Sequence, residues 1–138
     1  RPNTVPRHTL ENILATEEWT LNHVSERFYK KAHQCAARYD RDISEFEAVG
    51  LQEEYHSLTA PYVCESNLKI GLILEERADI QANGTHLIIG RIIETVIDEK
   101  NIGEDGFIDL ESAGTITVSG LDSYHSTNIL DRLPYAKP

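Results

Sequence analysis

The residues of this sequence that are best suited to chemistry lie in a basic turn close to its beginning. Arg7 and His8 immediately precede Thr9, which we predict as the N-cap of a short helix. The unpaired N–H groups and positive dipole end of a helix N-terminus bind anions, and basic neighbours strengthen that binding. Arg7 and Thr9 are therefore candidate ligands of a phosphate group, with Arg1 and Thr4 as weaker candidates. A plain capped helix with solvated basic neighbours is the alternative.

The six histidines do not form a metal-binding pattern. No pair has a zinc-ligand spacing such as His-Glu-x-x-His. His23 falls in a predicted strand and His33 in a predicted helix, where a structural role is expected. We therefore predict no metal site among His8, His23, His33, His56, His86 and His125.

The potential nucleophiles also lack a catalytic setting. Neither Cys64 nor Ser119 is surrounded by the residues that activate a cysteine or serine nucleophile. Glu45 and Glu47 are two residues apart, so they do not share a helix face. We predict no catalytic residue, and a protein that takes its chemistry from a cofactor is favoured. Cys64 and Cys35 are expected to be buried free thiols.

The charge of the chain limits its partners. The net charge is −10, and ten acidic residues face three basic ones between Glu75 and Glu111. Such a surface repels phosphate backbones, so nucleic acid and anionic membranes are not expected as partners. No apolar run has the length of a membrane span. A cytoplasmic location is expected. The sequence begins with Arg1 and contains no methionine, so we also expect an incomplete N-terminus.

The first third of the chain shows helical patterns around one short strand. A helix is predicted over 10–15, a strand over 19–24 and a second helix over 26–39, capped by Ser25. A further helical turn is predicted over 45–49. Ser44 is its expected N-cap and Gly50 its C-cap.

The remainder of the chain has sequence patterns that are typical of strands. Strands are predicted at 62–65, 68–75, 107–110 and 116–118, and Asn83-Gly84 is a strong turn signal. The segment 85–98 is nearly continuous in apolar residues, which predicts a long strand covered on both faces, as at a barrel wall or subunit contact. Residues 121–138 are expected to be a polar tail. We predict a mainly β fold, a small β-barrel with peripheral helices.

Five motifs in order along this chain resemble the flavin reductase-like family, the FMN-binding split barrels. The first, Arg7-His8-Thr9 followed by Asn12-Ile13, resembles the family's Lys-Asp-Thr turn, which Asn-Ile follows. The others are the strand 18–24, the element 44–51 of the type Glu-Phe-x-x-x-Gly-Leu, the Gly-x-His-x-x-x-Gly strand 84–90, and the segment 105–109 with Gly120 and Tyr124.

The resemblance implies a fold, a cofactor and site residues. It implies a single flavin reductase-like domain over 1–138, a split barrel that forms a homodimer with FMN near the subunit interface. The family's Lys-Asp-Thr turn contacts the FMN phosphate, so Arg7 and Thr9 take that role by resemblance. Arg1 and Thr4 are weaker candidates, and Tyr124 is placed near the flavin ring or the dimer contact.

The resemblance also implies an activity. Family members pass electrons from NAD(P)H through the flavin, often to a partner oxygenase or to another electron acceptor. The alternatives are a flavin-binding or electron-carrier split barrel without turnover, and a purely structural barrel. Two departures stand out: His8 replaces the family's aspartate, and the N-terminal strands that line the flavin ring in the family are missing from the sequence.

Overall fold

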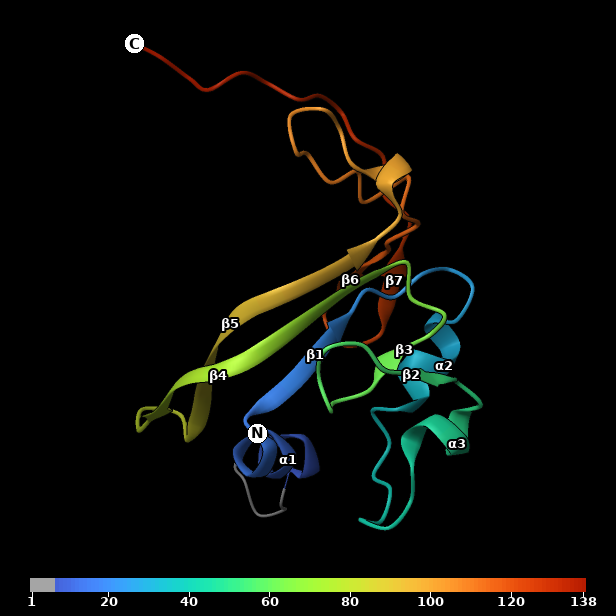
Figure 1. The fold of residues 1–138 in the computed structure, drawn as a ribbon, viewed down its shortest axis with the longest axis vertical. Helices are drawn as coiled ribbons and strands as arrows, with labels where there is room; N and C mark the ends of the chain where they lie inside the picture. Colours follow the sequence, from blue (N-terminus) through green and yellow to red (C-terminus); the bar gives the residue numbers. More distant parts are fainter. Residues whose placement is uncertain (1–6) are drawn as a thin grey trace.

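The computed structural model describes residues 7–138, and a three-stranded antiparallel sheet lies at its centre. The strands β1 (Glu18–Asn22), β4 (Leu68–Ile80) and β5 (Thr85–Ile97) follow one another across this sheet in the order β1-β4-β5. Two smaller antiparallel pairs flank it, β2 (Glu53–Glu54) with β3 (Tyr62–Val63) and β6 (Thr117–Ser119) with β7 (Ser123–His125). Figure 1 shows β4 and β5 as one long hairpin beside the short β1.

The β4–β5 turn forms as the Asn-Gly signal predicts. Gly84 adopts φ +65°, a left-handed conformation that suits glycine. The side chain of Asn83 accepts hydrogen bonds from the backbone N–H of Thr85 at 3.1 Å and from its hydroxyl at 2.7 Å. The two strands pair along their whole length, and the pairing register shifts after Gly71 and after Leu74.

Close packing across the sheet needs a glycine at position 90. A Cβ built on Gly90 would lie 2.2 Å from the ring of Trp19 on β1. The absence of a side chain therefore lets the indole pack directly against β5. The buried apolar residues come from α1, from β3 and β4 and from loops between elements: Ile13, Phe28, Leu58, Tyr62, Leu68, Leu72 and Ala113.

The helices differ from prediction at their ends. Helix α1 spans His8–Thr16, and Arg7, not Thr9, occupies the N-cap position with extended backbone angles. The N-cap prediction for Thr9 is thus wrong, because the helix begins one residue before it. Helix α2 covers Tyr29–Gln34 only, since residues 25–28 form a turn in which Ser25 O accepts from two N–H groups.

Helix α3 (Glu45–Val49) has the predicted bounds and both predicted caps. Ser44 Oγ accepts from Glu47 N at 3.4 Å, and Gly50 adopts φ +70°. These local signals were sufficient because each satisfies backbone groups at a helix end by itself. The short 3-10 helix η1 (Glu99–Asn101) follows β5.

Two predictions, one about a strand and one about the thiols, are wrong. Segment 107–110 is not a strand but makes a single bridge between Ile102 and Ile108. Ile92 on β5 is 58% exposed in the single chain, so the predicted cover of this strand at a barrel wall or subunit contact stays a prediction. The two cysteines are free, as predicted, but Cys35 is only partly buried and Cys64 is exposed. The predicted polar tail contains the unexpected strand β7.

Candidate functional site

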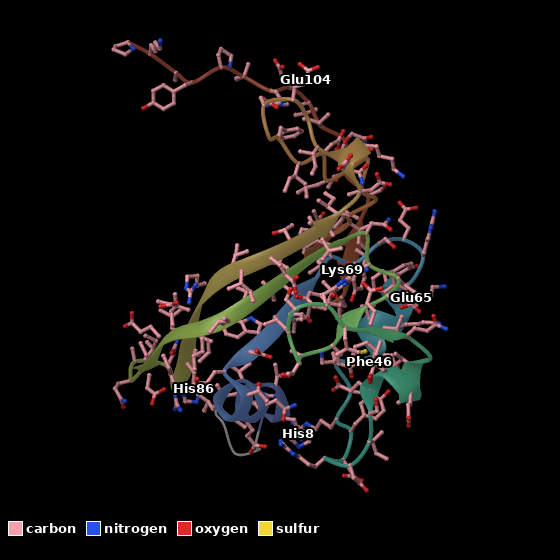
Figure 2. The ribbon with its side chains drawn as sticks, in the orientation of Figure 1. His8, Phe46, Glu65, Lys69, His86 and Glu104 are labelled. Carbon is pink, nitrogen blue, oxygen red and sulfur yellow. The ribbon has the colours of Figure 1, made fainter. Side chains whose placement is uncertain are left out.

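A hollow lies where the first turn of α1 meets the start of β5. Its volume is about 390 Å³. Arg7, Thr9, Thr85 and His86 supply its polar lining, and no carboxylate of the described residues lines it. Leu10, Ile13 and Ile88 form the apolar part of the wall. We call this the α1 hollow; Figure 2 labels His8 on the helix and His86 on the hairpin. A site with cationic and hydroxyl groups beside an apolar wall suits a ligand with an anionic end and an apolar body.

The helix N-terminus at this hollow is not capped by its N-cap side chain. Arg7 occupies the N-cap position and makes no side-chain capping bond. The first intrahelical bond runs from Glu11 N to Arg7 O at 3.0 Å. The N–H groups that precede it have no acceptor within the helix, as at every helix start. They add donors and a positive dipole end to the charge of Arg7.

His86 is held in place by a carboxylate. His86 Nδ1 lies 2.6 Å from Asp79 Oδ1, and Arg77 donates to both oxygens of Asp79 at 2.9 and 3.1 Å. The hydrogen bonds from His86 and Arg77 lower the pKa of Asp79 below its usual range. Since Nδ1 faces Asp79, Nε2 is the ring nitrogen that remains for another partner.

Thr9 lies between two hollows. The second one has a volume of about 290 Å³ and shares Thr9 and Ile13 with the α1 hollow. Trp19 from β1 and the segment 59–61 line its other side. Helix α1 is also held by Arg41, whose guanidinium donates to Asn12 Oδ1 at 3.0 Å and pairs with Glu11.

The structure does not bring all the predicted site residues together. Arg7 and Thr9 line the α1 hollow, but Arg1 and Thr4 lie outside the described residues. Tyr124 is on β7, where its ring packs 5.2 Å from that of Tyr29 and its hydroxyl is 3.0 Å from His33 Nδ1. Within one chain, Tyr124 therefore belongs to a different hollow from Arg7 and Thr9.

A second group of charged residues is paired internally. Lys69 on β4 is 7% exposed and donates to Glu54 on β2, which also lies 2.9 Å from His56 Nε2. We call these three residues the Lys69 network. The bonds from Lys69 and His56 lower the pKa of Glu54 to about 2. Beside it, Tyr62 donates to Glu94, and burial together with that carboxylate raises the pKa of Tyr62 well above its usual range. These groups satisfy one another and leave little for a ligand.

Two further properties of the described residues bear on function. Among residues 7–138, no three histidine, cysteine or acidic side chains are grouped so that they would hold a metal ion. The helices in that part of the chain are all too short or too polar to cross a membrane.

The sequence interpretation missed the contribution of β5 to the α1 hollow. The sequence alone assigns no role to His86 and does not place Thr85 beside Arg7. A signal was present, because Gly84-Thr85-His86 belongs to one of the quoted motifs. What was not visible is that the hairpin turn returns these residues to the first turn of α1.

Comparison with known proteins identifies the family. The model of the flavin reductase like domain matches residues 4–111, and this chain belongs to that family. Its fold is similar to the crystal structure of a putative flavin reductase with split barrel domain from Shewanella frigidimarina NCIMB 400. The TM-score is 0.92 and the identity 48%, over 95% of this chain and 67% of that one.

Two more distant similarities were also found. Nitrilotriacetate monooxygenase component B from Bacillus cereus shares the fold, with a TM-score of 0.79 and 22% identity over 96% of this chain and 68% of that one. An uncharacterized protein of Aquifex aeolicus (strain VF5) is 26% identical over 106 residues, which are 72% of this chain. This chain spans 53% of the length of that relative.

The family implies a flavin cofactor, and the α1 hollow can be tested for its fit to one. The donors at the hollow are a guanidinium, hydroxyls, an imidazole and helix N–H groups, and these are the groups that bind phosphate in proteins. The residues present therefore fit the phosphate end of a flavin nucleotide.

Proposed function

We propose that this protein binds FMN and passes electrons from NAD(P)H through it to an acceptor. The observation that carries the proposal is the α1 hollow, in which Arg7, Thr9 and His86 line a carboxylate-free wall at a helix N-terminus. Membership of the flavin reductase like family supports a flavin as the ligand. FMN is favoured over an unphosphorylated flavin because the donors suit a phosphate.

The residues of the hollow would divide the binding between charge and hydrogen bonds. Arg7 would pair with the phosphate, while the first N–H groups of α1 and the Thr9 hydroxyl would donate to its oxygens. His86, oriented by Asp79, would direct Nε2 toward the same group. When bound, FMN would supply the chemistry of hydride acceptance from a nicotinamide and onward electron transfer. Arg1, Thr4 and Tyr124 remain proposed contacts to the cofactor.

The wider proposal includes the form and the partners of the protein. We propose a single domain over 1–138 that forms a split-barrel homodimer with a cytoplasmic location. The electron acceptor would be an oxygenase or another redox partner. The likeness to a monooxygenase component B supports an oxygenase as one candidate.

Titration with FMN tests the proposal. The purified protein should bind FMN and quench its fluorescence, and Arg7→Glu should weaken binding by at least a hundredfold because it reverses the charge that meets the phosphate, at a cost of about 3 kcal/mol. Arg38→Glu is a matched control, since Arg38 is exposed and does not line the hollow. A wild-type protein that binds no FMN would refute the proposal.

An assay of NAD(P)H oxidation with excess FMN separates the two functional alternatives. A reductase should oxidise NAD(P)H in proportion to bound flavin. A protein that binds FMN but oxidises neither nicotinamide would be a flavin-binding or electron-carrier protein without this turnover.

A further inference from the structure

A chain of hydrogen bonds on the β4–β5 hairpin ends at the α1 hollow. Asp79 on β4 and His86 on β5 are direct partners in the pairing of the two strands, and His86 Nδ1 lies 2.6 Å from Asp79 Oδ1. Arg77, two residues before Asp79 on β4, donates to both oxygens of that carboxylate. Figure 2 labels His86 at this end of the hairpin. We call these three residues the hairpin triad. Its bonds lie within one hairpin, and His86 lines the hollow.

The bond to Asp79 determines which ring nitrogen of His86 carries a hydrogen. The hydrogen bonds from His86 and Arg77 lower the pKa of Asp79, so its carboxylate is ionised at neutral pH and can only accept. His86 Nδ1 must therefore be a donor. Arg77 Nη2 lies 3.5 Å from the same nitrogen, which is longer than a normal hydrogen bond, so it does not compete. Neutral His86 thus carries a hydrogen on Nδ1 and a lone pair on Nε2.

This tautomer of His86 is the wrong one for a phosphate. The oxygens of a phosphate dianion are acceptors, and so is the lone pair on Nε2 of the neutral ring. Only the imidazolium form donates from both of its nitrogens, to Asp79 and to a ligand at once. The phosphate group of a monoester is mostly a dianion above pH of about 6. A neutral His86 therefore has to gain a proton before it can bind this group.

The charges around His86 make such a gain depend on the ligand. Among the described residues, the charged groups that are bonded to His86 or line the hollow with it are Asp79, Arg77 and Arg7. Asp79 favours the imidazolium, and the two arginines oppose it. A bound dianion adds negative charge beside the ring and changes this balance in favour of the imidazolium.

We propose that Asp79, held by Arg77, is a positioning residue for His86, and that FMN binding at the α1 hollow transfers a proton from solvent to His86 Nε2, which then donates to the phosphate. The inference rests on the proposed function. It adds that FMN affinity depends on pH and that two residues outside the hollow control this dependence.

Calorimetric titration in two buffers of different ionisation enthalpy counts the protons that are taken up with FMN. Between about pH 7 and pH 9, uptake by the wild-type protein should reach roughly half to one proton per FMN. Over that range the affinity should fall about three- to tenfold per pH unit, because the slope equals the number of protons taken up. Riboflavin, which lacks the phosphate, should bind without uptake. FMN binding without proton uptake, or equal uptake with both flavins, would overturn the inference.

Two variants assign the proton and the positioning role. His86→Gln keeps a side chain with an N–H donor that does not titrate, so it should bind FMN without proton uptake. Asp79→Asn removes the charge that favours the imidazolium, so FMN affinity should begin to fall about one pH unit lower than in the wild type. Both positions are partly exposed, with 29% of the His86 side chain and 47% of the Asp79 side chain accessible, so neither change disturbs a packed interior.

Glu75→Gln is the matched control for Asp79→Asn. Glu75 pairs with Arg91 on the same hairpin but does not line the hollow. Its loss should leave both the proton uptake and the pH profile of FMN affinity unchanged. A wild-type pH profile in Asp79→Asn, or the same shift in both variants, would remove the positioning role from Asp79.

Nitrogen NMR of the ligand-free protein separates this inference from the proposed function. At a pH where His86 is neutral, its hydrogen should be on Nδ1 in the wild type, and a hydrogen on Nε2 would overturn the inference. FMN binding without proton uptake refutes this inference alone and leaves the proposed function standing. A protein that binds no FMN refutes the proposed function and the proton uptake with it, and the tautomer still decides whether Asp79 positions His86.

Discussion

At the first turn of α1, Arg7 and His86 face a hollow of about 390 Å³ whose lining contains no carboxylate of the described residues. In the Lys69 network, by contrast, a lysine that is 7% exposed is bonded to Glu54, and Glu54 is bonded in turn to His56. Figure 2 shows Lys69 well away from His86 along the sheet. The two regions contain similar side chains, but Lys69 is paired with a carboxylate, whereas at the hollow only His86 is paired, with Asp79, and no carboxylate lines the wall beside Arg7.

The difference shows where function and stability separate in this molecule. A buried cation that has its own carboxylate has no charge left for a ligand, and the loss of that carboxylate destabilises the folded state. A cation that faces an open hollow contributes little to folding, because water solvates it, and it remains available to an anion. Changes in the Lys69 network should therefore alter stability, and changes in the α1 hollow should alter affinity.

The largest effect on stability is expected from Glu54→Gln. This change leaves Lys69 buried without its carboxylate, which should lower the free energy of unfolding by about 3 kcal/mol. Urea unfolding measures it, and the affinity of the folded variant for FMN should be unchanged. Glu53→Gln is the matched control, because Glu53 is exposed and bonds only Tyr55 among the partners that the structure gives it. If Glu54→Gln lost affinity for FMN and kept its stability, the Lys69 network would serve binding and not folding, contrary to this account.

Protonation of Glu54 at low pH should lower the free energy of unfolding of the wild-type protein in the same way as Glu54→Gln does. The pKa of Glu54 is lowered from 4.5 to about 2 by Lys69 and His56, so its contribution is complete above pH 4.5 and is lost as the pH falls toward 2. The full contribution is at most about 3 kcal/mol. Urea unfolding at a series of pH values should show this slope in the wild type. The slope should be clearly reduced in Glu54→Gln, and an equal slope in both would contradict the assignment.

A smaller loss is expected from crowding the contact between β1 and β5. Gly90→Ala places a Cβ within 2.2 Å of the Trp19 ring, so the indole must move, at a cost of about 2 kcal/mol. The same substitution in a Trp19→Leu background should cost less than half as much, since a smaller side chain can give way. Thermal unfolding of the four proteins measures the coupling. Additive losses of stability in the double variant would show that residues 19 and 90 are not in steric contact.

The smallest effect is expected from one hydroxyl at the α1 hollow. Thr9→Val keeps the shape of the side chain and removes its donor, which should weaken FMN binding about fivefold, or by about 1 kcal/mol. Stability should not fall, because the Thr9 side chain does not cap the helix. Thr117→Val, at an exposed threonine on β6, is the control. An unchanged affinity in Thr9→Val would remove this residue from the proposed site.

Local signals in the sequence predicted much of this fold. The caps of α3 and the Asn83-Gly84 turn were correct because each depends on a few neighbouring residues that satisfy their own backbone groups. The prediction of a strand at 107–110 was wrong because neighbouring side chains satisfy backbone groups there as well, which the apolar pattern of the segment does not reveal. Asp105 accepts from Phe107 N and Asp109 accepts from the backbone N–H groups of residues 111 and 112, so turns at both ends replace a strand.

Only the part of the site that is formed by neighbours in the sequence could be predicted. Arg7 and Thr9 are close in sequence, and a helix start is recognisable from its residue types. Thr85 and His86 join them because the β4–β5 hairpin pairs with β1, which follows α1, and no local pattern specifies that long-range contact. The role of Asp79 depends on the same hairpin, which places it opposite His86 on the neighbouring strand.

The central claim is that the α1 hollow binds the phosphate of FMN, and the most direct test compares FMN with riboflavin. The two ligands differ by that phosphate alone, so the wild-type protein should bind FMN at least a hundredfold more tightly in a fluorescence titration. In Arg7→Glu this preference should disappear, because riboflavin affinity changes little while FMN affinity falls. Equal affinity of the wild-type protein for the two flavins would contradict the account.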